Sequence, residues 1–454
     1  MKPFRPPGTP HAEKARTPLW TWPAAGGLCA FAVALVLGRI RPERGTPLSG
    51  LWPGDNDSAS TALQALATGA VTVTTVTFSI TVVTLQLASQ QFSPRLLRRY
   101  ARDRTIKTVL TVLISTAVFT LTALAFLDAK RPVPAVALFV AATLGIASLA
   151  AVLGFLTHIV REVRVDSMML SVHDETDEAI RMFYPARTDP PRRSPGEPPD
   201  RVPGTTVHGR SSGFVRSVRV EELVEGARRA GAVVWLLVRP GDLVVSGNPI
   251  AVVWARDPST GASAPYPDEA GAADLVEGLL VLGYERTLEQ DVAFGFRQLE
   301  DIAVKAVSPG INDPQTACTA VGHMADLLVR VAGSRLGATV HEDRDGVGRA
   351  VVPDRDLRYY LDLACGQLRR YASAEPTVLG ALLRMLRDLA VAVRAEEDVA
   401  EVRRAADLVR DTVAPSVRPE DAEQVHDLHR RVVAALEGRT VEAYLDRSGE
   451  TRSV

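Results

Sequence analysis

The sequence is poor in cysteine and lysine, and several common catalytic motifs are absent from it. Its three cysteines, Cys29, Cys318 and Cys365, form no CxxC pair, which excludes a disulfide framework or a zinc ribbon and is typical of a reducing cytosol. None of its five lysines belongs to a GxxxxGK[ST] loop, and HExxH and GxGxxG are absent. We therefore expect no cofactor, no metal site and no enzymatic activity.

The net charge of −1 conceals two oppositely charged parts. Residues 1–160 contain 15 Lys or Arg against 6 Asp or Glu, whereas the remainder contains 37 basic and 47 acidic residues. This asymmetry indicates that the two parts lie in different surroundings. Because the basic residues are nearly all arginine in an Ala- and Val-rich chain, we ascribe them to a GC-rich bacterial genome and expect no nucleic-acid partner.

The first part contains four long apolar stretches. Each exceeds the roughly 20 residues that a helix needs to cross about 30 Å of hydrocarbon. No Asp, Glu, Lys or Arg lies in the middle of any of them, which argues against a proton-driven pump. We predict four transmembrane helices, at Leu19–Ile40, Ala59–Ser89, Ile106–Leu127 and Val133–Val160.

The orientation follows from the arginines and lysines of the short flanking segments. The N-terminal tail, the second loop and the segment after the last span carry 12 basic residues, whereas the first and third loops carry 5. Positive residues remain on the cytoplasmic side. We therefore expect a protein of the bacterial plasma membrane, with the lipid bilayer as a partner and both termini in the cytoplasm.

The second predicted span is rich in hydroxyl side chains. Eight Thr or Ser residues lie between positions 68 and 84, and amides gather at the cytoplasmic end. Such groups can replace part of the hydration shell of an ion, but they also let helices pack closely. Both interpretations stay open for the face that we single out as candidate pore lining: Thr74, Thr77, Thr81, Thr84, Gln86 and Gln90.

A helix with a cationic first face is predicted to begin directly after this span. Ser93 and Pro94 suit the N-cap and the first helical position. Four arginines then fall at i, i+3, i+4 and i+7, where they either contact anionic headgroups or only fix the loop in the cytoplasm. These candidate headgroup contacts are Arg95, Arg98, Arg99 and Arg102.

The remaining chain is predicted to be a cytoplasmic α+β region. A cytoplasmic tail at 1–18 and the membrane domain at 19–160 precede a connecting helix at 161–184, a Pro-rich linker at 185–204, a small β domain at 205–256 and a mainly helical domain at 274–454. The β domain is similar to the sandwich-like scaffold of lipoyl carriers, although an ordinary hairpin is equally compatible. Because no lysine lies between Lys130 and Lys305, cofactor carriage is excluded. The main break in the helical domain is predicted to be a loop at Gly333–Pro353.

The densest local pattern covers residues 283–321. Arg286, Gln290, Phe294, Arg297 and Asp301 are spaced to share one helical face, and Ser308-Pro309-Gly310 ends that helix before Asp313 caps the next. The pattern is either a site for an anionic ligand on the cytoplasmic side or a helix corner braced by Arg–Asp pairs. The candidate residues are Arg286, Gln290, Asp291, Arg297, Asp301, Ser308, Asn312 and Asp313.

Several motifs resemble a family of predicted bacterial multi-pass membrane proteins of unknown function. The likeness runs from about residue 15 to 440, with Lys305 and Val307 standing where Arg and Leu are expected. It implies a multi-pass protein with a cytoplasmic domain, and it supplies no reaction or catalytic residue. The matching motifs are Phe78-Ser79-Ile80, Gln91-Phe92-Ser93-Pro94-Arg95, Gln290-Asp291, Phe294-Gly295, Arg297-Gln298-Leu299, Asp301-Ile302-Ala303 and Ser308-Pro309-Gly310-Ile311-Asn312-Asp313-Pro314.

Two functions are compatible with these features. The first is a homo-oligomeric ion channel or passive transporter, in which the second span lines the pore and the cytoplasmic domain assembles or gates it; four helices per chain are too few to enclose a polar path alone. The second is a membrane-anchored sensor or scaffold, whose cytoplasmic domain binds a ligand or a protein partner.

Overall fold

The computed structural model describes residues 20–40, 52, 55–91, 104–127, 133–162, 165–184, 186, 203–256 and 263–445. The chain divides into two compact units, Met1–Met168 and Met169–Val454. The predicted tail at 1–18, most of the Pro-rich linker at 185–204, and Arg95, Arg98, Arg99 and Arg102 lie outside the described residues.

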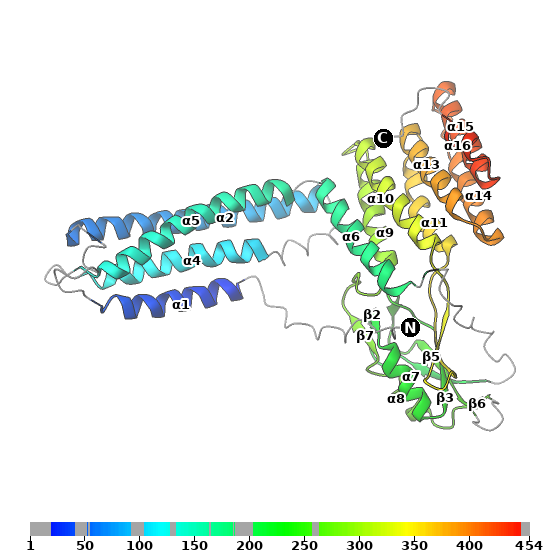
Figure 1. The fold of residues 1–454 in the computed structure, drawn as a ribbon, viewed down its shortest axis with the longest axis horizontal. Coiled ribbons are helices and arrows are strands. Elements are labelled where there is room, and N and C mark those ends of the chain that lie inside the picture. The colour runs from blue at the N-terminus through cyan, green and yellow to red at the C-terminus, as the bar shows by residue number, and fades with distance from the viewer. Residues whose placement is uncertain are drawn as a thin grey trace. The chain divides into compact units, whose positions relative to one another are not determined.

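The first unit consists of helices in its described part (Figure 1). Three of them are long and apolar enough to cross a membrane, and the fourth, α1, is an apolar helix of 17 residues. The helices are α1 (Thr21–Leu37), α2 (Asn56–Gln91), α4 (Arg104–Ala125) and α5 (Ala135–Glu162).

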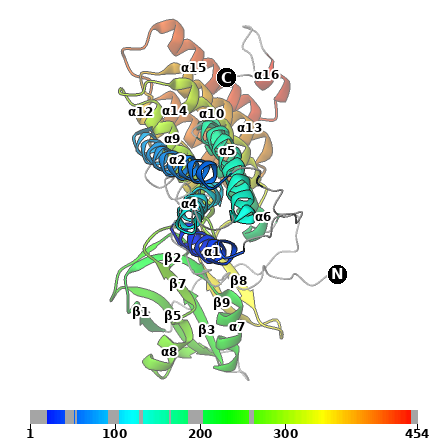
Figure 2. The same ribbon diagram turned by 90° about the vertical axis from the view of Figure 1, so that its left-hand side faces the viewer.

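These four helices pack around small side chains. α4 lies beside α1, α2 and α5 (Figure 2). Their shared core contains Ala34 of α1, Leu63 of α2, Phe119 of α4 and Ala141 of α5. A Cβ atom on Gly26 would lie 2.4 Å from Cγ2 of Thr111, so a glycine is needed where α1 meets α4. Small residues that let backbones approach are typical of packed membrane helices.

The second unit is a mixed α/β region, and α6 (Val165–Phe183) lies mostly within it. Its larger sheet has the order β1-β5-β3-β9-β8, with β6 paired to β5; β3 and β9 are parallel and the other pairs are antiparallel. A three-stranded antiparallel sheet has the order β4-β2-β7. The strands are β1 (Thr205–His208), β2 (Gly213–Val218), β3 (Ala232–Leu236), β4 (Leu243–Val244), β5 (Pro249–Arg256), β6 (Ser263–Pro265), β7 (Leu280–Gly283), β8 (Thr339–Glu342) and β9 (Gly348–Val352).

Both sheets contribute to one hydrophobic core. Val215 of β2, Val234 of β3 and Val253 of β5 are completely buried there, together with Ala227 of α7 and Val276 of α8. β3 alternates buried and half-buried residues, as expected of a strand with one face in the core. The two covering helices are α7 (Val220–Arg229) and α8 (Glu269–Val276).

Two predictions for the second unit were wrong. The segment Gly333–Pro353 is not a loop, because it contains the hairpin β8–β9, whose second strand joins the sheet through Val234↔Ala350 and Trp235↔Val351. The helical pattern that was predicted from residue 274 onward is interrupted by β7, which pairs with β2. Both errors have one cause, since short strands are stabilised here by partners far away in the sequence.

The rest of the second unit is helical. α10 packs against α9 and α13, and α13 packs against α15. Phe296, Met324 and Tyr360 are among the largest fully buried side chains. The helices are α9 (Val292–Ala306), α10 (Pro314–Ala332), α11 (Leu357–Cys365), α12 (Leu368–Tyr371), α13 (Pro376–Ala392), α14 (Glu396–Arg410), α15 (Pro419–Leu436) and α16 (Thr440–Tyr444).

Candidate functional site

The threonines that we singled out as candidate pore lining lie on the packed face of α2. Thr77, Thr81 and Thr84 are buried, with exposed fractions of 2, 6 and 8%, and Thr74 is half-buried. The hydroxyl of Thr81 donates to the carbonyl of Thr77 at 2.8 Å, and that of Thr74 donates to the carbonyl of Ala70 at 2.6 Å. Within one chain this face therefore serves helix packing, the alternative that the sequence left open.

The opposite face of α2 carries a second row of polar residues, which we call the polar stripe. From its first member to Ser79 the members recur at intervals of three or four residues, and Gln86 follows two turns later, so all of them lie within one narrow sector of the helix. All of them are exposed. The polar stripe consists of Asp57, Thr61, Gln64, Thr68, Thr72, Thr75, Ser79 and Gln86.

Apolar side chains border the polar stripe. At 100° per residue, Val71 and Phe78 lie on one side of it and Val76 and Val83 on the other, and all four are exposed. Val82 interrupts the stripe between Ser79 and Gln86. A polar row flanked by apolar residues is what a helix presents when one narrow face meets water or polar groups and its borders meet lipid or another helix.

Of the two candidate amides at the end of α2, Gln86 belongs to the polar stripe. The side chain of Gln90 lies outside the described residues. The candidate pore-lining threonines that we singled out from the sequence thus lie in the sector of α2 that is buried within one chain. The available signal was the spacing of Thr68, Thr72, Thr75 and Ser79, which is as regular as that of the buried face.

The candidate corner in the second unit is divided along α9. Arg286 and Gln290 precede the helix, which begins at Val292, so the predicted single face from Arg286 to Asp301 does not exist. The turn before Asp291 breaks the helical period. Gln290 instead forms a hydrogen bond with the last residue of β2: its Oε1 accepts from the backbone N–H of Val218 at 2.9 Å.

The far end of α9 holds the other candidates. Ser308 donates to the carbonyl of Lys305 at 2.6 Å, and Asn312 has a positive φ of 52°. The carboxylate of Asp313 accepts from the backbone N–H of Thr316 at 3.1 Å, which confirms the predicted cap with Pro314 at the start of α10. Because α9 has 15 residues, about 22 Å separates its two ends, and the eight candidates do not form one site.

Arg297 and Asp301 lie between these ends. Arg297 pairs with Glu300, whose side chain is 1% exposed, at 2.5 Å. Asp301 is half-buried on the same helix. The central part of α9 thus carries an internal ion pair.

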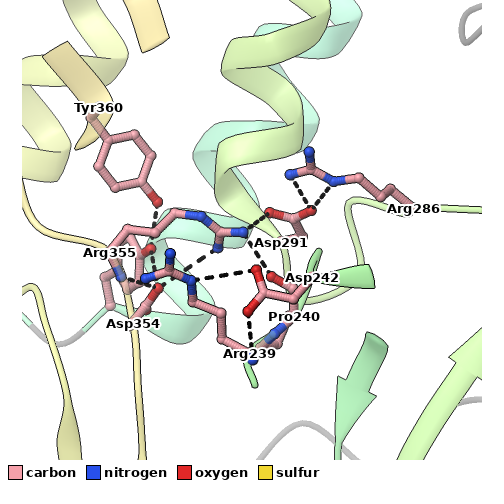
Figure 3. A network of polar contacts seen from close by, with 9 residues as sticks. Arg239, Pro240, Asp242, Arg286, Asp291, Asp354, Arg355 and Tyr360 are labelled. Atoms are coloured by element: carbon pink, nitrogen blue, oxygen red, sulfur yellow. Dashed lines mark hydrogen bonds and ion pairs between the residues drawn. The ribbon is translucent and has the colours of Figure 1, made fainter. Parts of the chain in front are cut away.

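A network of buried charges occupies the beginning of α9 (Figure 3). The carboxylate of Asp291, 1% exposed, lies between two guanidinium groups. Arg286 Nε donates to Asp291 Oδ2 at 2.8 Å, and Arg355 Nη2 lies 3.4 Å from Asp291 Oδ1. Arg355 itself is 3% exposed. Burial raises the pKa of Asp291 above its ordinary value, although both arginines favour the charged form.

The network continues toward α6. The backbone N–H of Arg355 donates to Oδ1 of Asp354 at 2.7 Å, and the Tyr184 hydroxyl donates to the same oxygen at 3.3 Å. The hydroxyls of Tyr184 and Tyr360 are 2.5 Å apart. Burial raises the pKa of Asp354 and of both tyrosines. These contacts attach the end of α6 to the segment between β9 and α11.

The turn between β3 and β4 also contributes residues to the network. Arg355 Nη2 donates to the carbonyl of Pro240 at 2.9 Å, and Arg239 lies 3.6 Å from Asp242. The guanidinium carbons of Arg239 and Arg355 lie 5.5 and 5.2 Å from the centre of the Tyr359 ring, within cation–π range. Gly241 has φ +93°, and a Cβ there would lie 2.2 Å from Asp291 Oδ2. The turn therefore closes against the carboxylate.

Several buried polar atoms of this network make no hydrogen bond within the described part of the chain. Arg239 Nε, Arg286 Nη2 and Asp291 Oδ1 have ion-pair contacts instead, whereas Arg355 contacts its partners through its Nη atoms and not through Nε. Such atoms are energetically expensive in a protein interior. The network joins the β region to the helical region of the second unit. Its buried polar atoms without hydrogen bonds reduce its net contribution to the stability of the fold.

The comparison with known families agrees with the long apolar helices of the first unit. The model of a family described as "Predicted membrane protein (DUF2254)" matches residues 16–388. The chain belongs to the DUF2254 family. Family membership confirms the resemblance predicted from the sequence motifs.

Relatives of this DUF2254 chain occur in mycobacteria. It is 31% identical over 435 residues to the uncharacterized protein MT1328 of Mycobacterium tuberculosis (strain CDC 1551 / Oshkosh), with 93% of this chain and 80% of the relative covered. The same identity and coverage hold for the uncharacterized protein Mb1321c of Mycobacterium bovis (strain ATCC BAA-935 / AF2122/97). No solved structure matches the chain.

Most of the charge network was not predicted from the sequence. Arg286 and Asp291 were among the candidate residues, but Arg239, Asp242, Asp354 and Arg355 were not singled out. The one available signal was the presence of charged residues beside proline in two short segments, Arg239-Pro240-Gly241-Asp242 and Pro353-Asp354-Arg355-Asp356. That signal does not indicate which charges meet, since Arg355 lies 64 positions after Asp291.

Proposed function

We propose that this DUF2254 protein is a homo-oligomeric channel or passive transporter of the bacterial plasma membrane. The polar stripe of α2 would line the conduit, and the second unit would assemble or gate it in the cytoplasm. The single observation that carries the proposal is the exposure of the polar stripe on a helix that is otherwise apolar enough to cross a membrane.

The proposal includes α1 as a fourth span. Its 17 residues extend about 26 Å, slightly less than the hydrocarbon core. Trp20 and Trp22 at its beginning are 68 and 45% exposed, and tryptophan is enriched at membrane interfaces. With four spans, both termini lie on the side that carries the arginine-rich segments, the cytoplasm.

The oligomer follows from the direction of the polar stripe. The packed face of α2 contacts its own chain, so the polar stripe faces outward from the single subunit. Hydroxyl and amide groups in hydrocarbon gain stability from polar partners or from water. Closed symmetry about an axis next to α2 would turn the polar stripes of several copies toward a common path.

A substitution series on α2 tests the conduit. We expect the combined substitutions Thr72→Val, Thr75→Val and Ser79→Ala to reduce solute flux into liposomes while the oligomer stays intact by gel filtration. The matched control, Thr77→Val with Thr81→Val on the packed face, changes stability with little direct effect on flux per assembled oligomer. Unchanged flux in the first variant, or a wild-type protein that passes no ion or small solute, would refute the proposal.

Thiol labelling tests the same geometry without a flux measurement. In a Cys29→Ser background, we expect Thr75→Cys to react with a charged, water-soluble thiol reagent in the intact membrane. Ile146→Cys on α5 is the control, because Ile146 is 70% exposed on an apolar helix and should face lipid. Equal protection of both cysteines would place the polar stripe away from water.

The alternative role, a membrane-anchored sensor or scaffold, is favoured by the buried charge network. Its atoms without hydrogen bonds, such as Asp291 Oδ1 and Arg355 Nε, are the kind of feature that a ligand-responsive site contains. In that role the triple substitution on the polar stripe leaves the cellular phenotype of the protein unchanged.

A further inference from the structure

We infer that the conduit conducts small inorganic cations in preference to anions. The inference rests on the proposed function and specifies its substrate class. It is drawn from the way in which the polar groups of α2 use their hydrogen atoms, and from the position of the one charged residue on that helix.

Two threonines in the central part of the polar stripe donate their hydroxyl hydrogens inward, to the helix backbone. Thr72 Oγ1 donates to the carbonyl of Thr68 at 2.8 Å, and Thr75 Oγ1 donates to that of Val71 at 3.0 Å. A hydroxyl has one hydrogen to donate and two lone pairs. Once the hydrogen is used, the group offers only oxygen lone pairs outward, and these suit a cation and repel an anion.

Near the beginning of α2, side chains of the polar stripe also donate hydrogen bonds within the helix. Thr61 Oγ1 donates to the carbonyl of Asp57 at 2.9 Å. Gln64 directs one of its two Nε2 hydrogens to the hydroxyl of Ser60 at 3.1 Å. Three threonines on the exposed face therefore use their only side-chain hydrogen within the helix, and one glutamine uses one of its two. Oxygen-lined walls of this kind replace the hydration shell of cations in selective pores.

An acidic side chain stands at the beginning of the polar stripe. Asp57 lies one helical turn before Thr61, in the same sector of α2, and it is exposed. The neighbouring Asp55 has a different task, because its Oδ1 accepts from the backbone N–H of Ser58 at 2.9 Å and thereby caps the helix. No lysine or arginine occurs between residues 56 and 91, so Asp57 supplies the only formal charge on α2.

Symmetry would repeat this carboxylate around the axis. A ring of Asp57 side chains at the extracytoplasmic mouth would concentrate cations and exclude anions before the oxygen-lined section begins. The acceptor wall and the acidic mouth are independent features of the helix, and they favour the same sign of charge.

The test is the reversal potential of the purified full-length protein in planar bilayers under a KCl gradient. We expect the wild-type current to reverse near the potassium equilibrium potential, with a K⁺ over Cl⁻ permeability ratio of about ten or more. Asp57→Asn should lower this ratio several-fold. Asp55→Asn is the matched control, because asparagine also caps a helix and the ratio should stay unchanged.

The outcomes separate the inference from the proposed function. A current that reverses near the chloride potential, or an Asp57→Asn variant with unaltered selectivity, overturns cation preference but leaves a channel in place. A chloride-selective current would assign selectivity to the arginine-rich segment after α2 instead. Absence of any current in the wild-type protein refutes the proposed function, and the inference with it.

Discussion

Arg355 Nη2 lies 3.4 Å from Oδ1 of Asp291, and neither side chain is more than 3% exposed. The two residues belong to different parts of the second unit, because Asp291 precedes α9 and Arg355 follows β9. The pair thus joins the helical region to the sheet. A charge buried to this extent is tolerated only as long as its partner is present.

Replacement of Arg355 should therefore destabilise the second unit strongly. We expect Arg355→Leu to lower the free energy of unfolding by about 3–5 kcal/mol, since it leaves the carboxylate of Asp291 buried with Arg286 as its remaining ion-pair partner. Chemical unfolding of the detergent-purified protein, followed by hydrogen exchange of peptides from α9 and β3, measures the loss.

The control for this prediction is Arg430→Leu. Arg430 is 59% exposed and pairs with Glu423 at 2.9 Å on the surface of α15. A surface ion pair contributes at most about 1 kcal/mol. If the two substitutions cost equal free energy, the Arg355 pair does not hold the unit together.

The pair also marks the limit of prediction from the sequence. The corner between α9 and α10 was predicted correctly because its signals are local: Asp313 caps the helix that Pro314 begins. The network depends on three segments that meet only in the folded unit, so no local pattern indicates that Arg355 contacts Asp291. The hairpin β8–β9 was missed for the same reason, since β9 requires β3 as a distant partner.

Two glycines in similar conformations allow the turn against Asp291 to be tested. Gly241 and Gly247 have φ values of +93° and +88°, but a Cβ meets nothing within 4 Å at Gly247 and lies 2.2 Å from Asp291 Oδ2 at Gly241. We expect Gly247→Ala to cost about 1–2 kcal/mol from backbone strain alone. Gly241→Ala should cost at least about 3 kcal/mol, because it also displaces the buried ion pair.

The comparison of unfolding midpoints for these two variants isolates the steric contribution. A Gly241→Ala variant as stable as Gly247→Ala would mean that the turn does not close against the carboxylate.

A second pair of glycines tests the contact between α6 and α9. A Cβ on Gly295 would lie 1.8 Å from Oγ1 of Thr176, which is buried. We expect Gly295→Ala to destabilise the protein by about 1–3 kcal/mol through overpacking. Gly322 in α10 has nothing within 4 Å of the same position, so Gly322→Ala should be neutral or stabilise by up to about 1 kcal/mol, because alanine favours helix.

The expected result is a lower unfolding midpoint for Gly295→Ala and an unchanged or higher midpoint for Gly322→Ala. Destabilisation by both would indicate that something other than the α6–α9 contact responds to the added methyl group.

The membrane helices show a different limit. The period of α2 predicted a helix, but both of its faces carry hydroxyls at helical spacing: Thr77 and Thr81 on the packed face, Thr72 and Thr75 on the exposed one. Which face is buried depends on the neighbouring α4 and α5. Small differences in the packing of neighbouring helices thus decide a functional assignment that sequence periodicity leaves open.

The cap of α10 gives a prediction with a defined dependence on pH. The Thr316 hydroxyl and backbone N–H bond the Asp313 carboxylate and lower its pKa below the ordinary value of 3.8. A carboxyl whose pKa is lower in the folded state contributes stability above its unfolded pKa, and that contribution is lost as the pH falls through the folded pKa. At pH 7 we expect Asp313→Ala to cost about 1 kcal/mol of stability.

The difference between wild type and Asp313→Ala should therefore narrow at pH values below about 4, as the wild-type carboxylate becomes protonated. Asp313→Asn is the control, because its amide oxygen caps the helix without titrating. Chemical unfolding at pH 7, 4 and 3 measures all three proteins. A gap that stays constant with pH would assign the stabilisation to cap geometry alone, whereas a loss of stability at pH 7 in Asp313→Asn as large as in Asp313→Ala would show that the negative charge, and not the hydrogen bonds, stabilises the start of α10.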